Sequence, residues 1–245
     1  MIPVIYPNYY PHQTNYNKRN NVATIVTTKV GTFSSTWKGS GTLYFDPGDG
    51  GPIEPLVLTP TGSGVAWNRA YPSVGSKIIK ITGDLSGVTY LYAVSDNVIN
   101  DLGSIVSRLI NLTYLNLYNN SISSDISAVS GLTNLNYLLL YANSMVGDIS
   151  AVSGLTNLTY LSLHSNNFSF TYTSFPAWSG DTYDLRSCVS TSQEVGDLIR
   201  AAANGGMNNC IYKLDGTNPA PPSIQEVTDA IATLAGNGVI LNVNT

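Results

Sequence analysis

The sequence predicts an α+β fold in which a small β-sandwich is followed by a short solenoid of repeats and an α/β cap. Three observations lead to this prediction. The phrase LTNLxYLxL is written twice, at 132–140 and 155–163, and a variant of it stands just upstream. Segments rich in β-branched residues, separated by Gly/Asp turns, precede the repeats, and two helical segments alternate with short apolar strands after them. We expect an N-terminal arm at 1–35, the sandwich at 36–84, the repeats at 85–180 and the cap at 181–245.

The composition excludes some classes of partner. Charged residues make up 11% of the 245 residues, against about 25% in a typical soluble protein. The net charge is −4, and Lys18 and Arg19 form the only adjacent basic pair. Because binding to a phosphate backbone needs clustered Lys and Arg, we expect no nucleic-acid partner. Asn, Ser, Thr, Gly and sixteen Tyr supply the polarity instead, a composition met in extracellular and virion proteins.

The sequence predicts no export signal and contains only two cysteines. The N-terminus lacks a basic segment followed by an apolar one, so we expect no secretory signal. No apolar run approaches the roughly 18 residues of a membrane span. Cys188 and Cys210 lie near the edges of predicted strands, and both a single disulfide and two buried thiols remain open. The absence of a CxxC pair argues against structural zinc.

The arm begins as an irregular segment rich in Tyr, Pro and Asn and ends in VATIVTTKV (22–30), a predicted strand. Such an arm would not keep one conformation in isolation. We therefore expect it to be held either by the protein's own body or by a neighbouring subunit.

The sandwich segment shows strands and turns in alternation. TWKGSGTLYFDPGDGGPIEPLVLTPTG (36–62) predicts two strands around a Gly/Asp turn, and YPSVGSKIIKITG (71–83) predicts another. LYFDPGDGG with this later strand resembles a degenerate PKD-type domain, whose signature is a GDG turn and a downstream TYxxxGxYxIxL strand. For Asp46 and Asp49 we prefer an Asx-type turn to a calcium site.

The repeat segment recurs at a step of 23 residues. The recurring columns are Leu109/Leu132/Leu155, Leu112/Leu135/Leu158, Leu115/Leu138/Leu161, Leu117/Leu140/Leu163, Asn120/Asn143/Asn166, Ile122/Met145/Phe168 and Val129/Val152. One more unit, Leu85-Val88-Leu91 with Asn97 and Ile99, fits upstream with a single insertion. The phrase LxxLxLxxN at this period resembles the leucine-rich-repeat family. The resemblance implies stacked short strands with buried leucines, and a structural ladder of Asn97, Asn120, Asn143 and Asn166 that bonds otherwise orphaned main-chain groups.

After the repeats, the chain predicts strand, helix, strand, helix and strand. TYDLRSC, CIYKLDG and VILNVNT are the strands, and STSQEVGDLIRAAANGG and PSIQEVTDAIATLAGNG are the helices. This run should prolong the repeat sheet and close its end. The tail is similar to those of leucine-rich-repeat proteins of gut Bacteroidetes and their phages.

The residues that vary between repeats predict the binding surface. They alternate with the buried leucines, so they point out of the opposite, concave face of each strand. The candidate ligand-binding residues are Tyr90, Tyr92, Tyr114, Asn116, Tyr118, Tyr137, Leu139, Tyr141, Tyr160, Ser162 and His164. Stacked tyrosines beside Asn and Ser suit sugar rings or a peptide surface. The alternative is that Tyr is simply a good strand residue on an exposed face.

Catalytic signatures are absent: the sequence has no GxSxG, HExxH, P-loop or GxGxxG. His164 lacks a ligand partner at metal spacing, so we interpret it as a contact residue. Paired carboxylates among Asp125, Asp148, Asp181 and Asp184 would be needed for glycoside hydrolysis, and nothing singles out a facing pair. We expect no catalytic residue, no metal and no cofactor.

The sequence therefore predicts a non-enzymatic recognition or adhesion protein. We favour a phage virion surface component (head fibre, decoration or tail-associated) that binds a host-surface glycan or protein and contacts neighbouring virion subunits through its arm. The expected location is the virion surface or the extracellular space, without membrane insertion, and a homo-oligomer remains open. Two alternatives stay open: a structural virion subunit that uses the repeats as a spacer, and a bacterial surface adhesin.

Overall fold

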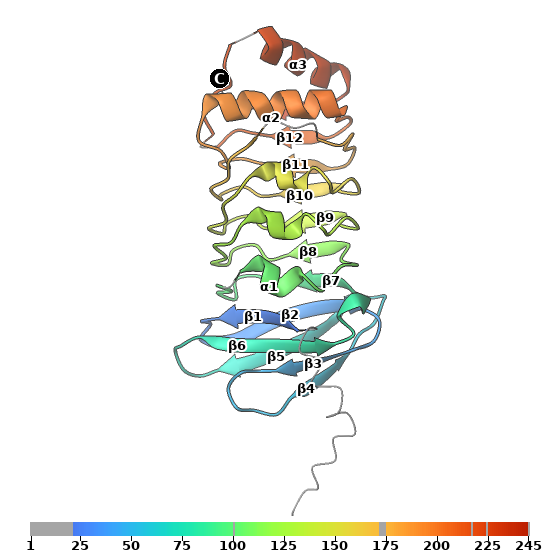
Figure 1. Cartoon of the computed structure of the whole chain (residues 1–245), viewed down its shortest axis with the longest axis vertical. Helices are drawn as coiled ribbons and strands as arrows, with labels where there is room; N and C mark the ends of the chain where they lie inside the picture. The colour runs from blue at the N-terminus through green and yellow to red at the C-terminus, as the bar shows by residue number, and fades with distance from the viewer. Residues whose placement is uncertain (1–21, 100, 172–174, 217, 224, 245) are drawn as a thin grey trace, which may run out of the picture.

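A computed structural model describes residues 22–99, 101–171, 175–216, 218–223 and 225–244. The molecule is an elongated stack, with a β-sandwich at one end and helix α3 (Gln225–Gly236) at the other (Figure 1). Most of the predicted arm, residues 1–21, lies outside the described residues.

The sandwich has one four-stranded antiparallel sheet in the order β1-β6-β3-β4. Its strands are β1 (Ala23–Thr27), β3 (Thr42–Asp46), β4 (Glu54–Val57) and β6 (Lys77–Gly83). The facing layer is formed by β2 (Gly31–Gly39) and β5 (Val65–Tyr71). Side chains alternate between buried and exposed along these strands, and the rings of Trp37, Phe45 and Trp67 pack between the layers, 5.6 Å and 4.7 Å apart.

The sandwich begins earlier in the chain than the sequence analysis placed it. Residues 22–35 were grouped with the arm, but they form β1 and the first part of β2, because Ala23, Ile25 and Phe33 are fully buried in the sandwich core. The boundary at residue 35 therefore falls inside a strand.

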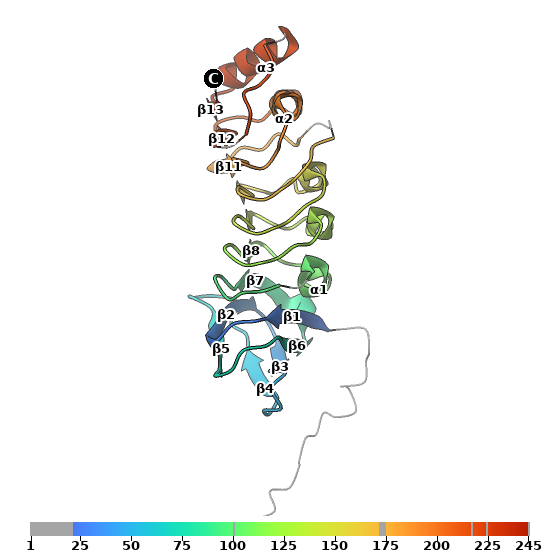
Figure 2. The ribbon, with the colours of Figure 1, turned by 90° about the vertical axis from the view of Figure 1, so that its left-hand side faces the viewer.

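The second layer of the sandwich continues without a break into the repeats. Strand β2 pairs antiparallel with β7 (Val88–Tyr92), Trp37 lying opposite Leu91. From β7 onward all strands are parallel, giving one nine-stranded sheet in the order β13-β12-β11-β10-β9-β8-β7-β2-β5 (Figure 2). The sandwich and the solenoid thus share one sheet and one continuous core.

Each repeat places a three-residue strand on one side and a short helical turn on the other (Figure 2). The strands are β8 (Tyr114–Asn116), β9 (Tyr137–Leu139) and β10 (Tyr160–Ser162). The turns are α1 (Leu102–Val106) and the 3₁₀ helices η2 (Ile126–Val129) and η3 (Ile149–Val152); another 3₁₀ helix, η1 (Leu85–Gly87), precedes β7. Asp125 and Asp148 accept hydrogen bonds from the main-chain N–H groups of Ser127 and Ser150, so these acids cap the 3₁₀ helices on the side away from the sheet.

Asparagines tie each turn to the repeat before it. The Asn143 Nδ2 donates to the carbonyls of Leu117 (3.0 Å) and Leu140 (2.9 Å), and its Oδ1 accepts from the Ile122 N–H (3.0 Å). Asn120 and Asn166 make the corresponding bonds in their own repeats. One side chain therefore satisfies main-chain groups that the short strands leave unpaired.

At the first repeat the ladder position belongs to Asp96, where the sequence analysis placed Asn97. Asp96 is buried and Val98 fills the place of Ile122, whereas Asn97 is exposed with φ of 51°. The insertion follows Val98, which shifts the alignment by one residue. Among the described residues, the β1–β2 loop takes the place of a preceding repeat, and the Nζ of its Lys29 lies 2.9 Å from the Asp96 carboxylate. The Asp96 carboxylate forms an ion pair with Lys29, which the neutral amide of an asparagine could not do.

The ladder continues past the predicted asparagines with other residue types. Cys188 stands three residues after Leu185, and its Sγ donates to the Leu163 carbonyl at 3.1 Å. In the next layer, Asn218 accepts from the N–H groups of Cys188 and Val189 and donates to two carbonyls. Cys188 and Cys210 are free, buried thiols, and burial raises the pKa of both.

The C-terminal segment adds three parallel strands and two helices to the stack. They are β11 (Thr182–Asp184), α2 (Ser192–Gly205), β12 (Ile211–Lys213), α3 and β13 (Ile240–Asn242). Helix α2 begins at a capping box of Thr191 and Glu194. Stacked rings of Phe175, Trp178 and Tyr183, 5.0 Å and 4.9 Å apart, fill the space between the last repeat and α2.

Replacing Asn143 by alanine should lower the free energy of unfolding by about 2 kcal/mol, because the Ile122 N–H loses its partner and the carbonyls of Leu117 and Leu140 keep only the amides of Asn120 and Asn166. Asn143→Cys should cost less, since Cys188 shows that a thiol can donate to the equivalent carbonyl. Urea unfolding measures both. Asn134→Ala, at an exposed site, serves as the control, and a cysteine variant no more stable than the alanine variant would contradict the prediction.

Candidate functional site

The outer face of the sheet, opposite the helical turns, carries side chains in straight rows across the strands. The parallel register aligns Tyr90, Tyr114, Tyr137 and Tyr160 on β7 to β10. Four residues after each strand's first tyrosine, a second row holds Tyr118, Tyr141 and His164. We call these seven residues the tyrosine face.

The rings of each row stack on one another. In the first row the ring centroids of Tyr90 and Tyr114 are 4.3 Å apart, and the next two steps are 5.7 Å and 6.1 Å. In the second row Tyr118 and Tyr141 are 4.5 Å apart at 7°, and Tyr141 and His164 are 4.4 Å apart at 18°. The three shortest spacings, 4.3–4.5 Å, are close to the strand separation of about 4.8 Å, so the sheet sets the stacking distance of these rings. The rings of Tyr114, Tyr137 and Tyr160 lie farther apart.

A third row lies between the two rows of rings and is largely covered by them. It holds Tyr92, Asn116, Leu139, Ser162 and Asp184. Asn116 and Ser162 are only 3% and 2% exposed, so these two predicted contact residues lie beneath the surface. Asn116 links the two rows instead, because its Nδ2 donates to the Tyr114 hydroxyl and its Oδ1 accepts from the Tyr118 N–H.

Tyr90, Tyr141 and His164 of the tyrosine face are uncharged at neutral pH. Burial raises the pKa of Tyr90 and Tyr141 to about 12, so both hydroxyls keep their protons. Burial also lowers the pKa of His164 from 6.5, although the nearby carboxylate of Asp184 opposes that effect. The tyrosine face therefore offers neutral rings, hydroxyls and an uncharged imidazole.

Charged and aliphatic residues that sequence reasoning missed lie at the ends of the rows. The Lys38 Nζ lies 4.7 Å from the ring centroid of Tyr90, a cation–π contact. At the other end Arg186 makes a bidentate ion pair with the buried Asp184, at 2.7 Å and 2.9 Å. The first row runs on through Thr182, Ile211 and Ile240. Taking the residue next to each buried position of β2 and of the segments around β11–β13 could have found them, because successive side chains in a strand point to opposite faces.

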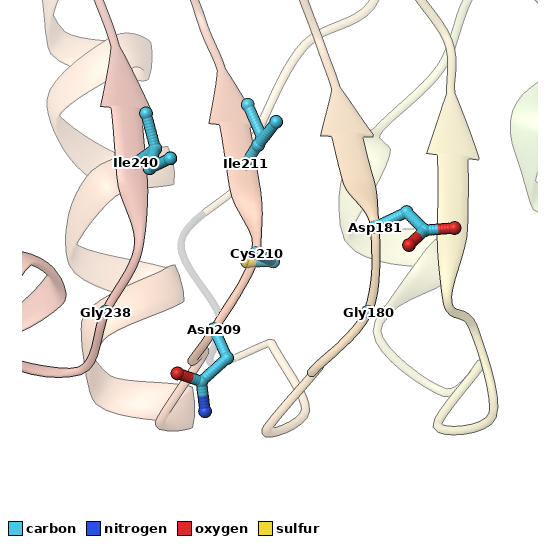
Figure 3. A pocket seen from close by; sticks show the side chains of 7 residues that line it. All are labelled: Gly180, Asp181, Asn209, Cys210, Ile211, Gly238 and Ile240. Carbon is cyan, nitrogen blue, oxygen red and sulfur yellow. The ribbon is translucent and has the colours of Figure 1, made fainter.

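A shallow hollow of about 340 Å³ lies where this row ends. Figure 3 shows the Ile211 and Ile240 side chains on neighbouring strands, with Asn209 and Asp181 at the loops that precede β12 and β11. The hollow combines two aliphatic side chains with one exposed carboxylate.

Three of the four carboxylates considered for catalysis have structural partners, whereas Asp181 is exposed at the hollow. Asp184 pairs with Arg186, and Asp125 and Asp148 cap 3₁₀ helices. Asp46 and Asp49 accept from the N–H groups two residues ahead, as Asx turns do, and Asp49 also pairs with Arg69. In the described part of the chain, no three His, Cys, Asp or Glu side chains gather as a metal site would require.

Among the described residues, no helix has the length and apolarity needed to cross a membrane.

Because the pKa of His164 is lower in the folded protein than the 6.5 of a free imidazole, the unfolded chain binds more protons as the pH falls. His164 should therefore make the protein less stable as the pH drops from above 6.5 toward the folded pKa. Urea unfolding at several pH values should show that part of the loss disappear in His164→Tyr, which extends the ring row without titrating. Asp184, Arg186 and Lys213, the charges nearest the imidazole, remain in both proteins. Identical pH dependence of the two would contradict the prediction.

Comparison with known proteins gives one family match and several distant structural likenesses. The leucine-rich-repeat family model matches residues 111–132. An internalin of Listeria monocytogenes is 23% identical over 64% of this chain and 48% of its own, with a TM-score of 0.39. The functional domain of a second internalin from that organism is 16% identical over 59% of this chain and 34% of its own, with a TM-score of 0.36. The BIR3–SERK2 complex of Arabidopsis thaliana gives 18% identity, 64% and 70% coverage and a TM-score of 0.35.

The chain spans about half the length of the first internalin and about a third of the second. No curated protein sequence matches the chain. The structural scores are low, so the identification depends on the repeats themselves. With the family model matching 111–132 and the same residues recurring every 23 positions, the chain carries leucine-rich repeats.

Proposed function

We propose that the chain is a non-enzymatic binding protein that contacts a partner protein through the tyrosine face. The observation that carries the proposal is the pair of stacked ring rows on the outer face of the repeat sheet. Stacked repeats present extended surfaces of this kind for binding. Tyrosine also supplies a large contact area at little cost in side-chain entropy.

The stacking favours a protein partner over a glycan, the other ligand class expected from the sequence. A sugar ring packs against the flat face of an aromatic ring, but here Tyr90 and Tyr114 in the first row, and Tyr118, Tyr141 and His164 in the second, turn flat faces toward one another. The outer face of Tyr90 is approached by Lys38. Ring edges and hydroxyl groups are left for a ligand, and these suit the mixed apolar and hydrogen-bonding surface of a protein.

The first row gives the contact surface its length. It carries no charged side chain from Tyr90 on β7 to Ile240 on β13. Six strand separations of about 4.8 Å make this strip about 29 Å long. The second row changes from rings to Arg186 and Asp215 beyond His164, so a partner would meet charges on one side only.

For the setting, we propose a surface component of a phage virion, such as a head fibre, decoration or tail-associated protein. The low charge of 11% and the uncharged binding face support a role outside a cell. In this proposal the arm contacts neighbouring virion subunits. A structural spacer within the particle is the second candidate, and a bacterial surface adhesin is the third.

The double variant Tyr118→Ala/Tyr141→Ala should weaken binding at least tenfold, because central aromatic residues contribute about 1–2 kcal/mol or more each at protein interfaces. Flow cytometry of the labelled protein on gut-bacterial cells measures this, with protease-treated cells and a glycan array alongside. We expect the protein to bind untreated cells but neither protease-treated cells nor the glycan array.

Tyr44→Ala, which removes a half-buried tyrosine from the sandwich, is the matched control and should bind normally. Circular dichroism should show all variants folded, because Tyr118 and Tyr141 are half-exposed. Binding that survives protease and appears on the glycan array would overturn the protein partner. Absence of binding by every folded form would favour the spacer.

A further inference from the structure

In the part of the chain that the structure describes, strand β13 is an edge strand of the nine-stranded sheet. The Ile240 N–H donates to the Cys210 carbonyl at 2.9 Å, and the Asn242 carbonyl accepts from the Leu214 N–H at 2.8 Å. These two residues therefore turn their main-chain groups toward β12. Alternation along a strand directs the main-chain N–H and C=O of Leu241 the other way. Within the described ranges no hydrogen bond to those two groups is found.

The other three sheet edges are protected. Strand β5 carries Arg69, ion-paired with Asp49 and Glu54 at 2.8 Å and 2.9 Å. Strand β4 contains Glu54 and Pro55, and β1 is covered at one end, where the Ile99 N–H donates to the Val26 carbonyl at 2.9 Å. Charge, proline and coverage are among the means of blocking an edge, and an edge that lacks them offers main-chain groups for pairing with another strand.

The sequence around β13 suits pairing with a copy of itself. Residues 238–244, GVILNVN, contain no ionisable side chain. In an antiparallel pair around a two-fold axis, the central residue faces its own symmetry mate and the flanking residues face one another in exchanged pairs, so a strand of one charge sign would repel its copy. Ile240 is 60% exposed, and pairing would bury part of its apolar surface away from water.

We propose that β13 pairs antiparallel with β13 of a second copy of this chain. The pair is centred on Leu241, whose N–H donates to the Leu241 carbonyl of the other copy, and the reverse. Ile240 then lies opposite Asn242 of the other copy, twice in each dimer. Helix α3 lies at the same end of the molecule, and its Ala232 and Ala235 are small and exposed.

This pairing has a consequence for the proposed function. The two-fold axis of an antiparallel strand pair is perpendicular to the sheet, so both tyrosine faces would lie on the same side of one continuous sheet. A dimer would present two binding surfaces in one direction, and avidity would strengthen attachment to a surface that carries many partners. The dimer itself does not depend on the proposed function.

Sedimentation equilibrium of the whole chain over a concentration series tests the proposal, and a monomer–dimer equilibrium is expected. In Ile240→Lys/Asn242→Lys, lysine faces lysine twice across the pair, which should weaken dimerisation at least about tenfold. The control Val57→Lys/Val74→Lys makes the same change in charge at two exposed sites in the sandwich and should dimerise normally. Mixing the edge lysine variant with Ile240→Glu/Asn242→Glu should restore the dimer.

Three results would overturn the proposal: a chain that stays monomeric, a dimer that the edge lysines leave unchanged, or a dimer that Tyr118→Ala/Tyr141→Ala abolishes. The last result would place the second copy on the tyrosine face. Circular dichroism of the edge variants checks their folding. The dimer of the Tyr118→Ala/Tyr141→Ala variant should persist even where its partner binding is lost, which separates failure of the proposed function from failure of the dimer.

Discussion

The register between neighbouring strands is the constraint on which the binding surface depends. Leu115, Leu138 and Leu161 are fully buried and lie directly opposite one another across β8, β9 and β10. A slip of one residue would turn those leucines to solvent, so burial of the leucines fixes the register. The tyrosines one position earlier must then align as well. The same interaction that builds the core therefore sets the ring-to-ring distances on the outer face.

The polar ladder shows how the stack adapts where its neighbours change. Between like repeats, an asparagine bonds to both adjacent turns. Where the sandwich meets the first repeat, Asp96 replaces it, because Lys29 supplies a positive charge to pair with its carboxylate. Where the repeats meet the helical cap, Cys188 makes the bond to the preceding carbonyl, and Asn218 bonds the Cys188 N–H from the next layer. The residue type at each ladder position thus depends on the groups that the neighbouring layer offers.

How far the sequence could predict this structure depends on whether a feature repeats. The 23-residue step locates the strands and both ring rows, because a buried residue and its exposed neighbour recur together. The pairing of β2 with β7 has no period, since it joins distant segments in antiparallel register, and so the sequence suggested a separate sandwich. The prediction that Asn97 belongs to the ladder was wrong, because the position of a single insertion cannot be chosen without knowing that Val98, and not Ile99, is buried. Burial of Asn116 and Ser162 also escaped prediction, because it arises from rings on both sides.

Stacking prepares the tyrosine face for binding and couples its members. Rings held 4.3–4.5 Å from their neighbours already have few rotamers, so a partner that immobilises them forfeits little side-chain entropy. Removing one ring frees a face of the next, so substitutions at Tyr118 and Tyr141 should not add independently. Tyr141 has a ring on each side, whereas Tyr118 lies at the end of its row, and the central ring therefore controls the order of the row. The surface acts as a unit because the strands beneath it cannot move separately.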